Sequence, residues 1–278
     1  MLSYRHAFHA GNHADVLKHI VLTLVLDYLK QKEKSFWYID THAGAGVYAL
    51  DSSEAKKNSE FKTGIERLLD HRDELPELLQ PYLAVVDELR RALPRGYPGS
   101  PAFAEHLLRE QDRLRLFELH PQDHQLLKDN FSKDRRVLIA QSDGFAGLKA
   151  LLPPAPRRAA VLIDPPYELK EDYAQVVRAL RDSLQRFSTG TYIIWYPLLS
   201  RDESQWLPRK LLELPVASLR VELKVENPKG EFGMFGSGLF IVNPPWLLHE
   251  QMQQLLPSLV RLLGQSSDAQ FLLEAKGE

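Results

Sequence analysis

The sequence predicts an α/β fold in which a mostly parallel sheet carries helices on both faces. Short apolar runs rich in β-branched residues alternate with helical patterns along the 278 residues, as in βαβ units. The run from Ala159 to Ile163 contains no charge, which is typical of a strand buried on both faces of a parallel sheet. The last two runs follow each other without a helix between them, so one strand is expected to be antiparallel.

Seven strands are expected, and a helical insertion follows the first of them. The strands span residues 36–40, 114–119, 137–140, 160–164, 191–196, 219–226 and 238–243. This is the plan of a Rossmann-like class I methyltransferase. Residues 1–50 then hold an N-terminal segment and the start of the core, residues 51–98 form a small inserted helical subdomain, and residues 99–278 complete the core.

Histidines crowd into the first nineteen residues. Four of the ten lie there, namely His6, His9, His13 and His19. A helix is expected from about Asn12 to Lys30, which places Lys18 and His19 in its first turns. Such a segment can contact phosphates, stack on a base and close over a cofactor, whereas a solvated helix start explains the same residues more simply. The histidine spacings match no H-E-x-x-H pattern, so no metal site is expected.

A glycine loop follows the first expected strand. Gly44 and Gly46 let the backbone turn tightly and approach a ligand at the carboxyl edge of the sheet, which predicts a cofactor loop. The spacing also matches the weak dinucleotide fingerprint G-x-G-x-x-A through Ala49, so a nicotinamide enzyme is an alternative. That fingerprint requires a helix directly after the loop, whereas the polar turn at residues 51–54 follows here.

Three further segments are expected at the same edge of the sheet. Ser100, followed by Pro101, is expected to cap a helix whose amino end faces a cofactor carboxylate, although a cap without a ligand explains it equally well. Glu118 ends the second strand and can accept hydrogen bonds from both ribose hydroxyls of an adenosyl group. Asp143 can accept one from an adenine amino group and Gly144 lets the base lie close, but Asp-Gly is also a common turn.

The segment Asp164-Pro165-Pro166-Tyr167 directly follows the most apolar strand and predicts methyl transfer to an amino nitrogen. Two prolines make a rigid extended corner. An amino group conjugated to a ring is a poor nucleophile, because its lone pair is delocalised. The Asp164 carboxylate and the Pro165 carbonyl can accept from its two N–H bonds and direct the lone pair at a methyl donor, while Tyr167 stacks on the ring. A turn that only ends a strand is the competing explanation.

A second Pro-Pro motif, Asn243-Pro244-Pro245-Trp246, follows the last expected strand. Because that strand is expected to be antiparallel, the motif should lie at the opposite edge of the sheet, and we interpret it as structural. The glycine-rich turn at residues 229–238 fits either a mobile flap beside a target base or a passive loop.

The composition excludes several classes of protein. The absence of cysteine excludes a disulfide framework and a thiolate metal site. No signal peptide and no apolar stretch of the ~20 residues that span a bilayer is visible, so a soluble cytoplasmic protein is expected. The formal net charge of −2 gives no overall basic footprint, and any nucleic-acid surface must therefore be local.

Several motifs together point to one family. They are residues 1–19, 40–46, 97–101, 107–112, 163–168, 190–192, 195–197 and 243–246. These segments resemble the RlmJ family of 23S ribosomal RNA adenine-N6 methyltransferases. The similarity spans nearly the whole chain, and the opening nineteen residues are far more specific than Asp-Pro-Pro-Tyr. The insertion and residues 264–278 match least.

The resemblance implies an S-adenosylmethionine-dependent enzyme that methylates N6 of one adenine in 23S rRNA during ribosome assembly. The residues it places at the cofactor, with the two loop glycines added, are His19, His42, Gly44, Gly46, Ser100, Glu118, Asp143, Gly144 and Asp164. Asp164 would also engage the target amine beside Pro165 and Tyr167. Tyr4, His6 and Lys18 are expected RNA contacts. The expected partner is free or partly assembled 23S rRNA, and the expected enzyme is a monomer.

Other enzymes could use the same corner. A DNA adenine methyltransferase differs only in its substrate. A glutamine methyltransferase typically carries Asn in place of Asp164, which this chain lacks. A catalytically silent RNA-binding relative is expected to have lost Asp164 or Tyr167, and both are present.

Overall fold

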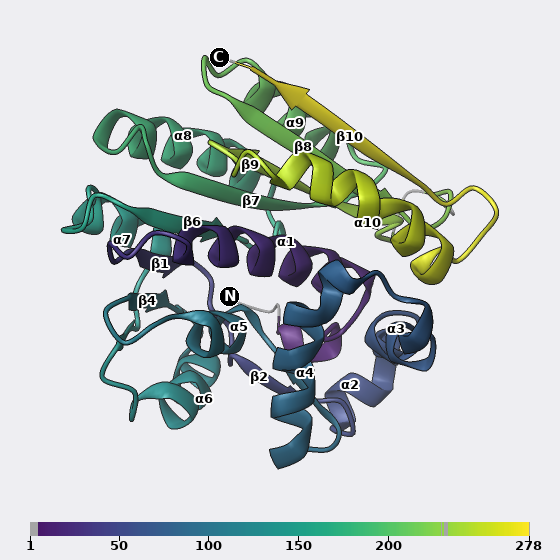
Figure 1. The fold of residues 1–278 in the computed structure, drawn as a ribbon. Coiled ribbons are helices and arrows are strands. Elements are labelled where there is room, and N and C mark those ends of the chain that lie inside the picture. Colours follow the sequence, from purple (N-terminus) through teal and green to yellow (C-terminus); the bar gives the residue numbers. More distant parts are fainter. Residues whose placement is uncertain (1–4, 229, 231–232, 278) are drawn as a thin grey trace.

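The structure, a computed structural model, describes residues 5–228, 230 and 233–277. These residues contain an eight-stranded sheet. The strand order is β10-β8-β9-β7-β6-β1-β4-β5 (Figure 1). The strands are β1 (Trp37–Asp40), β4 (Arg113–Phe117), β5 (Val137–Ala140), β6 (Ala159–Ile163), β7 (Thr191–Leu198), β8 (Ser218–Lys224), β9 (Gly236–Val242) and β10 (Gln270–Lys276).

All seven expected strands are confirmed, with ends that differ by one or two residues at most. The expected total of seven is wrong, because β10 adds an edge strand that pairs antiparallel with β8. β10 is exposed or half-buried throughout, so it lacks the apolar alternation by which strands are recognised in sequence. Strands β1, β4, β5, β6 and β7 are mutually parallel, whereas β9 is antiparallel to β7 and β8.

Helices cover both faces of the sheet. On one face, the core includes side chains of α1 (His13–Lys30), α5 (Ser100–Leu107), α6 (Pro121–Phe131) and α10 (Leu248–Leu263). On the other face, it includes those of α7 (Gly144–Leu151), α8 (Lys170–Arg186) and α9 (Asp202–Leu212). Figure 1 shows α8 and α9 across the sheet from α1. No helix of the described residues is long and apolar enough to cross a membrane.

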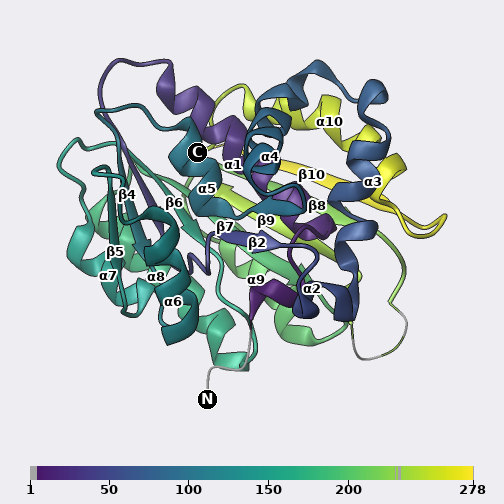
Figure 2. The ribbon, with the colours of Figure 1, turned by 90° about the horizontal axis from the view of Figure 1, so that it is seen from below.

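The segment between β1 and β4 is largely helical. It contains α2 (Ser53–Asn58), α3 (Ile65–Asp70), α4 (Gln80–Ala92) and the 3-10 turns η2 (Glu60–Lys62), η3 (Arg72–Glu74) and η4 (Glu77–Leu79). A two-stranded ribbon, β2 (Val47–Ala49) with β3 (Gly96–Pro98), joins its two ends. Figure 2 shows these helices on the same side as α1 and α10, and their apolar residues share the α1 core. The division at residues 51 and 98 stays a prediction.

Helix α1 is buried along most of its length, between the sheet and the helices α4, α5 and α10. It begins where expected, with the Asn12 side chain accepting a hydrogen bond from Asp15 N at 2.9 Å. Lys18 and His19 are only 5% and 1% exposed. The alternative of a solvated helix start is therefore wrong. The short turn η1 (His6–Phe8) precedes α1.

Candidate active site

The carboxyl ends of the parallel strands bring most of the expected site segments to one edge of the sheet. β1 pairs in register with β4 and β6, so their ends lie side by side. Glu118 follows β4, Asp143 lies three residues beyond β5, and Asp164 follows β6 directly. The loop after Asp40 lies between them. The gathering expected from strand order is confirmed.

The glycine loop after β1 turns as expected. Gly44 and Gly46 have φ values of 60° and 74°, in the region that favours glycine. A Cβ atom at Gly44 would lie 2.3 Å from the Tyr48 hydroxyl. The next element is strand β2, not a helix, so the structure lacks the helix that a dinucleotide fingerprint requires.

Glu118 holds the glycine loop by a hydrogen bond to its backbone. Its Oε2 accepts a hydrogen bond from Gly44 N at 2.8 Å, and its Oε1 accepts one from His120 N at 2.7 Å. Burial raises the pKa of Glu118, although these two hydrogen bonds act against the rise. A carboxylate has about four acceptor positions, so Glu118 can still accept hydrogen bonds from a ligand.

Asp40 is a buried carboxylate that the sequence reasoning missed. Its Oδ2 accepts hydrogen bonds from the hydroxyls of Ser100 at 2.6 Å and Tyr38 at 2.7 Å. Burial raises the pKa of Asp40, against the effect of these hydrogen bonds. The N-cap of α5 is Gly99 and not Ser100. The Ser100 hydroxyl donates to Asp40 instead of capping the helix. The sequence signal that could have identified Asp40 is an acidic residue at the end of a strand, before a glycine loop.

Lys18 lies beside the Asp-Pro-Pro-Tyr corner. Its ammonium donates to Asp164 Oδ2 at 2.7 Å and lies 3.0 Å from Asp15 Oδ1. Asp15 Oδ2 in turn contacts His6 Nε2 at 2.8 Å and accepts from Gly11 N at 2.9 Å. Lys18 is 5% exposed and its ammonium is engaged by two carboxylates, while its expected contact with RNA stays a prediction.

The buried Lys18 ammonium is stabilised by the carboxylates of Asp164 and Asp15. Burial alone would lower the pKa of Lys18, but the carboxylates of Asp164 and Asp15 outweigh it and raise the pKa above its usual range. Burial would likewise raise the pKa of Asp15, but His6 and Lys18 hold it well below its usual range. The ammonium is therefore charged at neutral pH, between two acidic groups.

The Asp-Pro-Pro-Tyr corner leaves two acceptors unused. Within the described residues, Asp164 Oδ1 and the Pro165 carbonyl accept no hydrogen bond from the protein. Tyr167 has a φ of 51°, and its hydroxyl donates to the Trp195 carbonyl at 2.6 Å. Its ring packs 4.6 Å from that of Tyr173 and is 2% exposed. Tyr167 thus supports the corner from below, and an open face for stacking on a base is not present in this arrangement.

Two histidines of the expected cofactor set are held neutral. His19 Nδ1 lies 2.9 Å from the Tyr97 hydroxyl, while its buried Nε2 has no partner among the described residues. Burial lowers the pKa of His19, and it lowers that of His42 to about 4 despite the nearby Asp164 and Asp143 carboxylates. His42 Nδ1 lies 2.8 Å from the Thr41 hydroxyl.

Asp143 and Gly144 have structural partners of their own. Asp143 is the N-cap of α7 and accepts a hydrogen bond from Phe145 N at 3.0 Å. A Cβ atom at Gly144 would lie 2.1 Å from the Thr41 carbonyl oxygen, so this glycine is needed for packing against the β1 loop. This packing is enough to explain a glycine at position 144, without the expected close approach of a base.

The second Pro-Pro motif lies at the opposite edge, as expected. Val242 ends β9 opposite Tyr192 near the start of β7. The Asn243 amide donates to the carbonyls of Ser188 and Gly190, both at 2.7 Å. Trp246 is 74% exposed.

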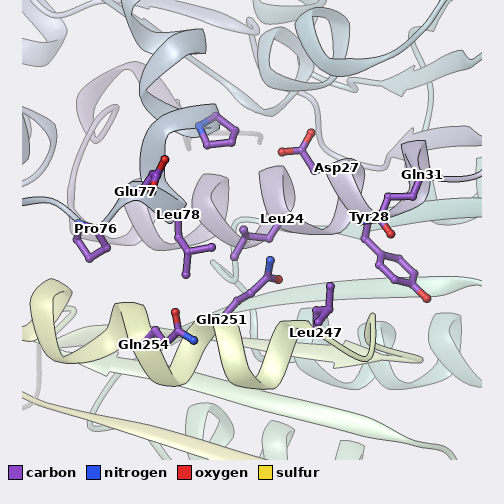
Figure 3. Close-up of a pocket in the computed structure, with 11 residues that line it drawn as sticks. Leu24, Asp27, Tyr28, Gln31, Pro76, Glu77, Leu78, Leu247, Gln251 and Gln254 are labelled. Carbon is purple, nitrogen blue, oxygen red and sulfur yellow. The ribbon is translucent and has the colours of Figure 1, made fainter.

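Some expected features lie outside the described residues, namely Tyr4 and residues 229, 231 and 232 of the glycine-rich turn. The described residues contain no group of three or more His, Asp or Glu side chains placed to hold a metal ion. A hollow of about 460 Å³ between α1, residues 76–81 and α10 is lined by Asp27 and Glu77 (Figure 3). It lies near the far end of α1 from Lys18 and is not part of the candidate active site.

Comparisons with known proteins agree with this geometry. The family model described as Ribosomal RNA large subunit methyltransferase D, RlmJ matches residues 33–272. Ribosomal RNA large subunit methyltransferase J of Haemophilus influenzae is 48% identical over 99% of this chain and 98% of its own. The protein of the same name from Escherichia coli is 48% identical, with 93% of each chain covered. A crystal structure of a Legionella pneumophila protein covers 96% of this chain and 98% of its own, at 38% identity and a TM-score of 0.88.

Proposed function

Because the chain belongs to the RlmJ family of ribosomal RNA large subunit methyltransferases, we propose that it methylates the N6 amino group of one adenine in 23S ribosomal RNA, with S-adenosylmethionine as the methyl donor. The observation that carries the choice of an amino nitrogen is the pair of unused acceptors, Asp164 Oδ1 and the Pro165 carbonyl, at the carboxyl end of β6.

These two acceptors hold the target amine. Each accepts a hydrogen bond from one N–H, which favours a pyramidal nitrogen whose lone pair points away from the corner. S-adenosylmethionine supplies an electrophilic methyl group on a positively charged sulfur. The proline ring fixes φ at Pro165 and Pro166, so both acceptors are held in place before the base arrives. As the methyl carbon bonds to the nitrogen, its bond to sulfur would break and S-adenosylhomocysteine would leave, and Asp164 would then accept the proton that the nitrogen loses.

Lys18 positions Asp164. Its ammonium occupies Oδ2 at 2.7 Å, which fixes the carboxylate and leaves Oδ1 for the amine. A neighbouring cation favours the ionised form of a carboxylate. Asp15 and His6 hold this ammonium from the other side. Lys18 and His6, which the sequence predicts as RNA contacts, therefore act on the acceptor Asp164.

The cofactor is proposed to lie along the same edge of the sheet. The residues that hold it are His19, His42, Gly44, Gly46, Ser100, Glu118, Asp143, Gly144 and Asp164. Two features support the fit: the buried His19 Nε2 has no protein partner among the described residues, and Glu118 retains unused acceptor positions. If the Tyr97 hydroxyl donates to Nδ1, then Nε2 carries the proton and donates to a ligand.

The base must reach Asp164 from an unpaired segment or by extrusion from a helix, because N6 of a paired adenine is not accessible at this corner. Tyr4 and His6 are proposed to contact the RNA beside it. Tyr167 is proposed to act from beneath the corner, by fixing its backbone through the hydrogen bond to the Trp195 carbonyl. Residues 51–98 are proposed to be an inserted unit, for which packing against α1 and orientation of the substrate are equally open roles.

The test is transfer of labelled methyl groups from S-adenosylmethionine to protein-free 23S rRNA from a strain that lacks this gene. Mass spectrometry of the digested nucleosides is expected to show one N6-methyladenosine for each RNA molecule. A DNA substrate and a protein extract are assayed beside it. Label in DNA, in protein or in another nucleoside would overturn the proposal while leaving the methyl donor intact.

A further inference from the structure

A basic cleft lies at the amino edge of the sheet, opposite the candidate active site. Its volume is about 400 Å³, and it is lined by Lys32, Lys34, Arg157, Arg158, Thr189 and Thr191, with apolar side chains at its base. Arg158 immediately precedes the first residue of β6, and Thr191 is the first residue of β7. The cleft and Asp164 are therefore at opposite ends of the same strand.

The positive charge in this cleft is not neutralised by the protein. Within the described chain, Lys32, Lys34 and Arg157 are exposed and form no ion pair. The Arg158 guanidinium donates to the main-chain carbonyls of Lys34 and Leu29, and the acid that acts on it, Asp112, is already paired with Arg109. No described lining residue is acidic, and Glu33 is the exposed acid on the adjoining turn. In a chain of net charge −2, this is a local concentration of cations.

The backbone at Arg157 points to a use for its side chain. Its φ is 56°, in the left-handed region that favours glycine. The turn is closed by Arg157 N donating to the Pro154 carbonyl at 2.8 Å. Glycine would fit this turn without strain, so the turn does not explain why this residue is an arginine. The exposed guanidinium of Arg157 does explain it.

The second Pro-Pro motif is hydrogen-bonded to residues of this cleft. The Asn243 amide donates to the carbonyls of Ser188 and Gly190, which flank Thr189 of the lining. The Thr191 hydroxyl also donates to the Asn243 carbonyl at 3.0 Å. Trp246 follows Asn243 by three residues and is 74% exposed. An exposed indole so near in sequence to the cleft suits a stacked base near a phosphate chain.

We propose that this cleft and Trp246 form a second RNA-binding surface, which holds the phosphodiester backbone of the substrate at a distance from the target adenine. The inference rests on the proposed function, since it takes the substrate to be RNA. The cations bind phosphates and set the position of the RNA without reading its sequence. The acidic hollow near α10 cannot do this, because Asp27 and Glu77 would repel phosphates.

The geometry sets a minimum length for the RNA. Strand β6 has five residues, which at ~3.3 Å per residue separate its two ends by roughly 16 Å. Stacked nucleotides advance ~3.4 Å each, so about five stacked nucleotides span this distance, and more if the RNA follows the surface. A short RNA reaches only Asp164, whereas a long one reaches both sites.

The test compares two RNAs and two charge-matched double variants, without methyl donor, by fluorescence anisotropy across a salt series. One RNA carries fewer than about five nucleotides on each side of the target, and the other several times that length. Lys32→Glu with Arg157→Glu removes cleft cations. Arg178→Glu with Arg181→Glu, at exposed positions in the middle of α8, changes the net charge equally.

The cleft variant is expected to bind the long RNA at least about tenfold more weakly, with a salt slope reduced by roughly two, and to bind the short RNA as the unaltered protein does. Trp246→Ala is expected to weaken the long RNA about fivefold or more, and Trp246→Phe to restore much of it. Equal losses in both double variants, or for both RNAs, would overturn the proposal. Thermal unfolding shows whether each variant is folded. Methylation of the short RNA tests the proposed function separately, because it does not require the cleft.

Discussion

The two Pro-Pro corners of this protein are similar in sequence and opposite in structure. Asp164-Pro165-Pro166-Tyr167 follows β6, and Asn243-Pro244-Pro245-Trp246 follows β9. Each contains one left-handed residue that is not glycine, Tyr167 with a φ of 51° and Asn243 with a φ of 50°. In the first corner the aromatic ring is 2% exposed and the carboxylate keeps an unused oxygen. In the second, Trp246 is 74% exposed and the amide nitrogen of Asn243 donates to two main-chain carbonyls.

Strand direction explains the difference. β6 is parallel to β1 and β4, so its end meets the glycine loop and Glu118, whereas β9 is antiparallel and ends beside the start of β7. A polar group can act on a ligand only if the fold leaves some of its hydrogen-bonding capacity unused. Asp164 meets this condition at the ligand edge, while Asn243 uses its donors to fasten a turn.

The largest expected effect is loss of methylation in Asp164→Ala. Removing one prearranged hydrogen-bond partner of a reacting group costs roughly 100-fold to 1000-fold in kcat. Cofactor binding, measured by calorimetry, is expected to remain detectable because the glycine loop and Glu118 are unchanged. A variant that turns over within threefold of the unaltered enzyme would contradict the assignment of the first corner.

Lys18→Met is expected to impair the same corner through Asp164. Without the ammonium, Asp164 Oδ2 loses the hydrogen bond that fixes the carboxylate, and Asp15 loses a cation that holds its pKa down. The single-turnover rate is expected to fall about tenfold or more, because a hydrogen bond to a charged group is worth roughly 1.5 kcal/mol or more. Lys18→Arg keeps the positive charge and is the matched control. An unchanged rate in Lys18→Met would show that the cation does not position Asp164.

Asn243→Ala is expected to lower stability and leave chemistry unchanged. It removes two hydrogen bonds, worth about 1 kcal/mol each, and places alanine in the left-handed region at a further cost of about 1 kcal/mol. Asn243→Gly should lose only the hydrogen-bond part. Denaturant unfolding measures both. Equal losses in the two variants would mean that backbone strain contributes nothing at this corner.

Acid should destabilise the protein through two buried histidines, His13 and His42. Burial lowers the pKa of His13, as of His42, to about 4, despite the nearby Glu60, Asp15 and Glu226. Between roughly pH 6.5 and 4 the unfolded chain binds more protons, so stability falls as the pH falls, by up to about 1.4 kcal/mol per pH unit for each histidine. His13→Gln should reduce this slope by up to one proton in urea unfolding at pH 7, 6 and 5. Parallel curves would contradict a neutral, buried His13.

The sequence was sufficient for the parts of the fold that depend on local patterns. The apolar runs identify the seven strands, and the missing helix before 238–243 identifies the antiparallel one among them. The eighth strand, β10, was missed because its residues are exposed at the sheet edge. The N-cap assignment at Ser100 was displaced by one residue, because a hydrogen bond to Asp40, sixty positions earlier, takes its hydroxyl.

The sequence predicted that the site segments gather at one edge of the sheet, and it did not predict the contacts of their side chains. Lys18 and Asp164 are 146 positions apart, and no local signal indicates that α1 passes the end of β6. The same holds for Tyr167, whose aromatic type suggested stacking on a base, whereas packing against Tyr173 and Trp195 buries it. Side-chain orientation at this corner depends on tertiary packing, which a motif does not contain.

The most direct test of the account is the single-turnover rate of N6-methyladenosine formation in 23S rRNA, measured side by side for Asp164→Ala and Asn243→Ala and normalised to the folded fraction of each. The account predicts a loss of at least about 100-fold for Asp164→Ala and a rate close to that of the unaltered enzyme for Asn243→Ala. A folded Asn243→Ala that is equally inactive, or an active Asp164→Ala, would contradict the claim that only the corner at the carboxyl edge performs the chemistry.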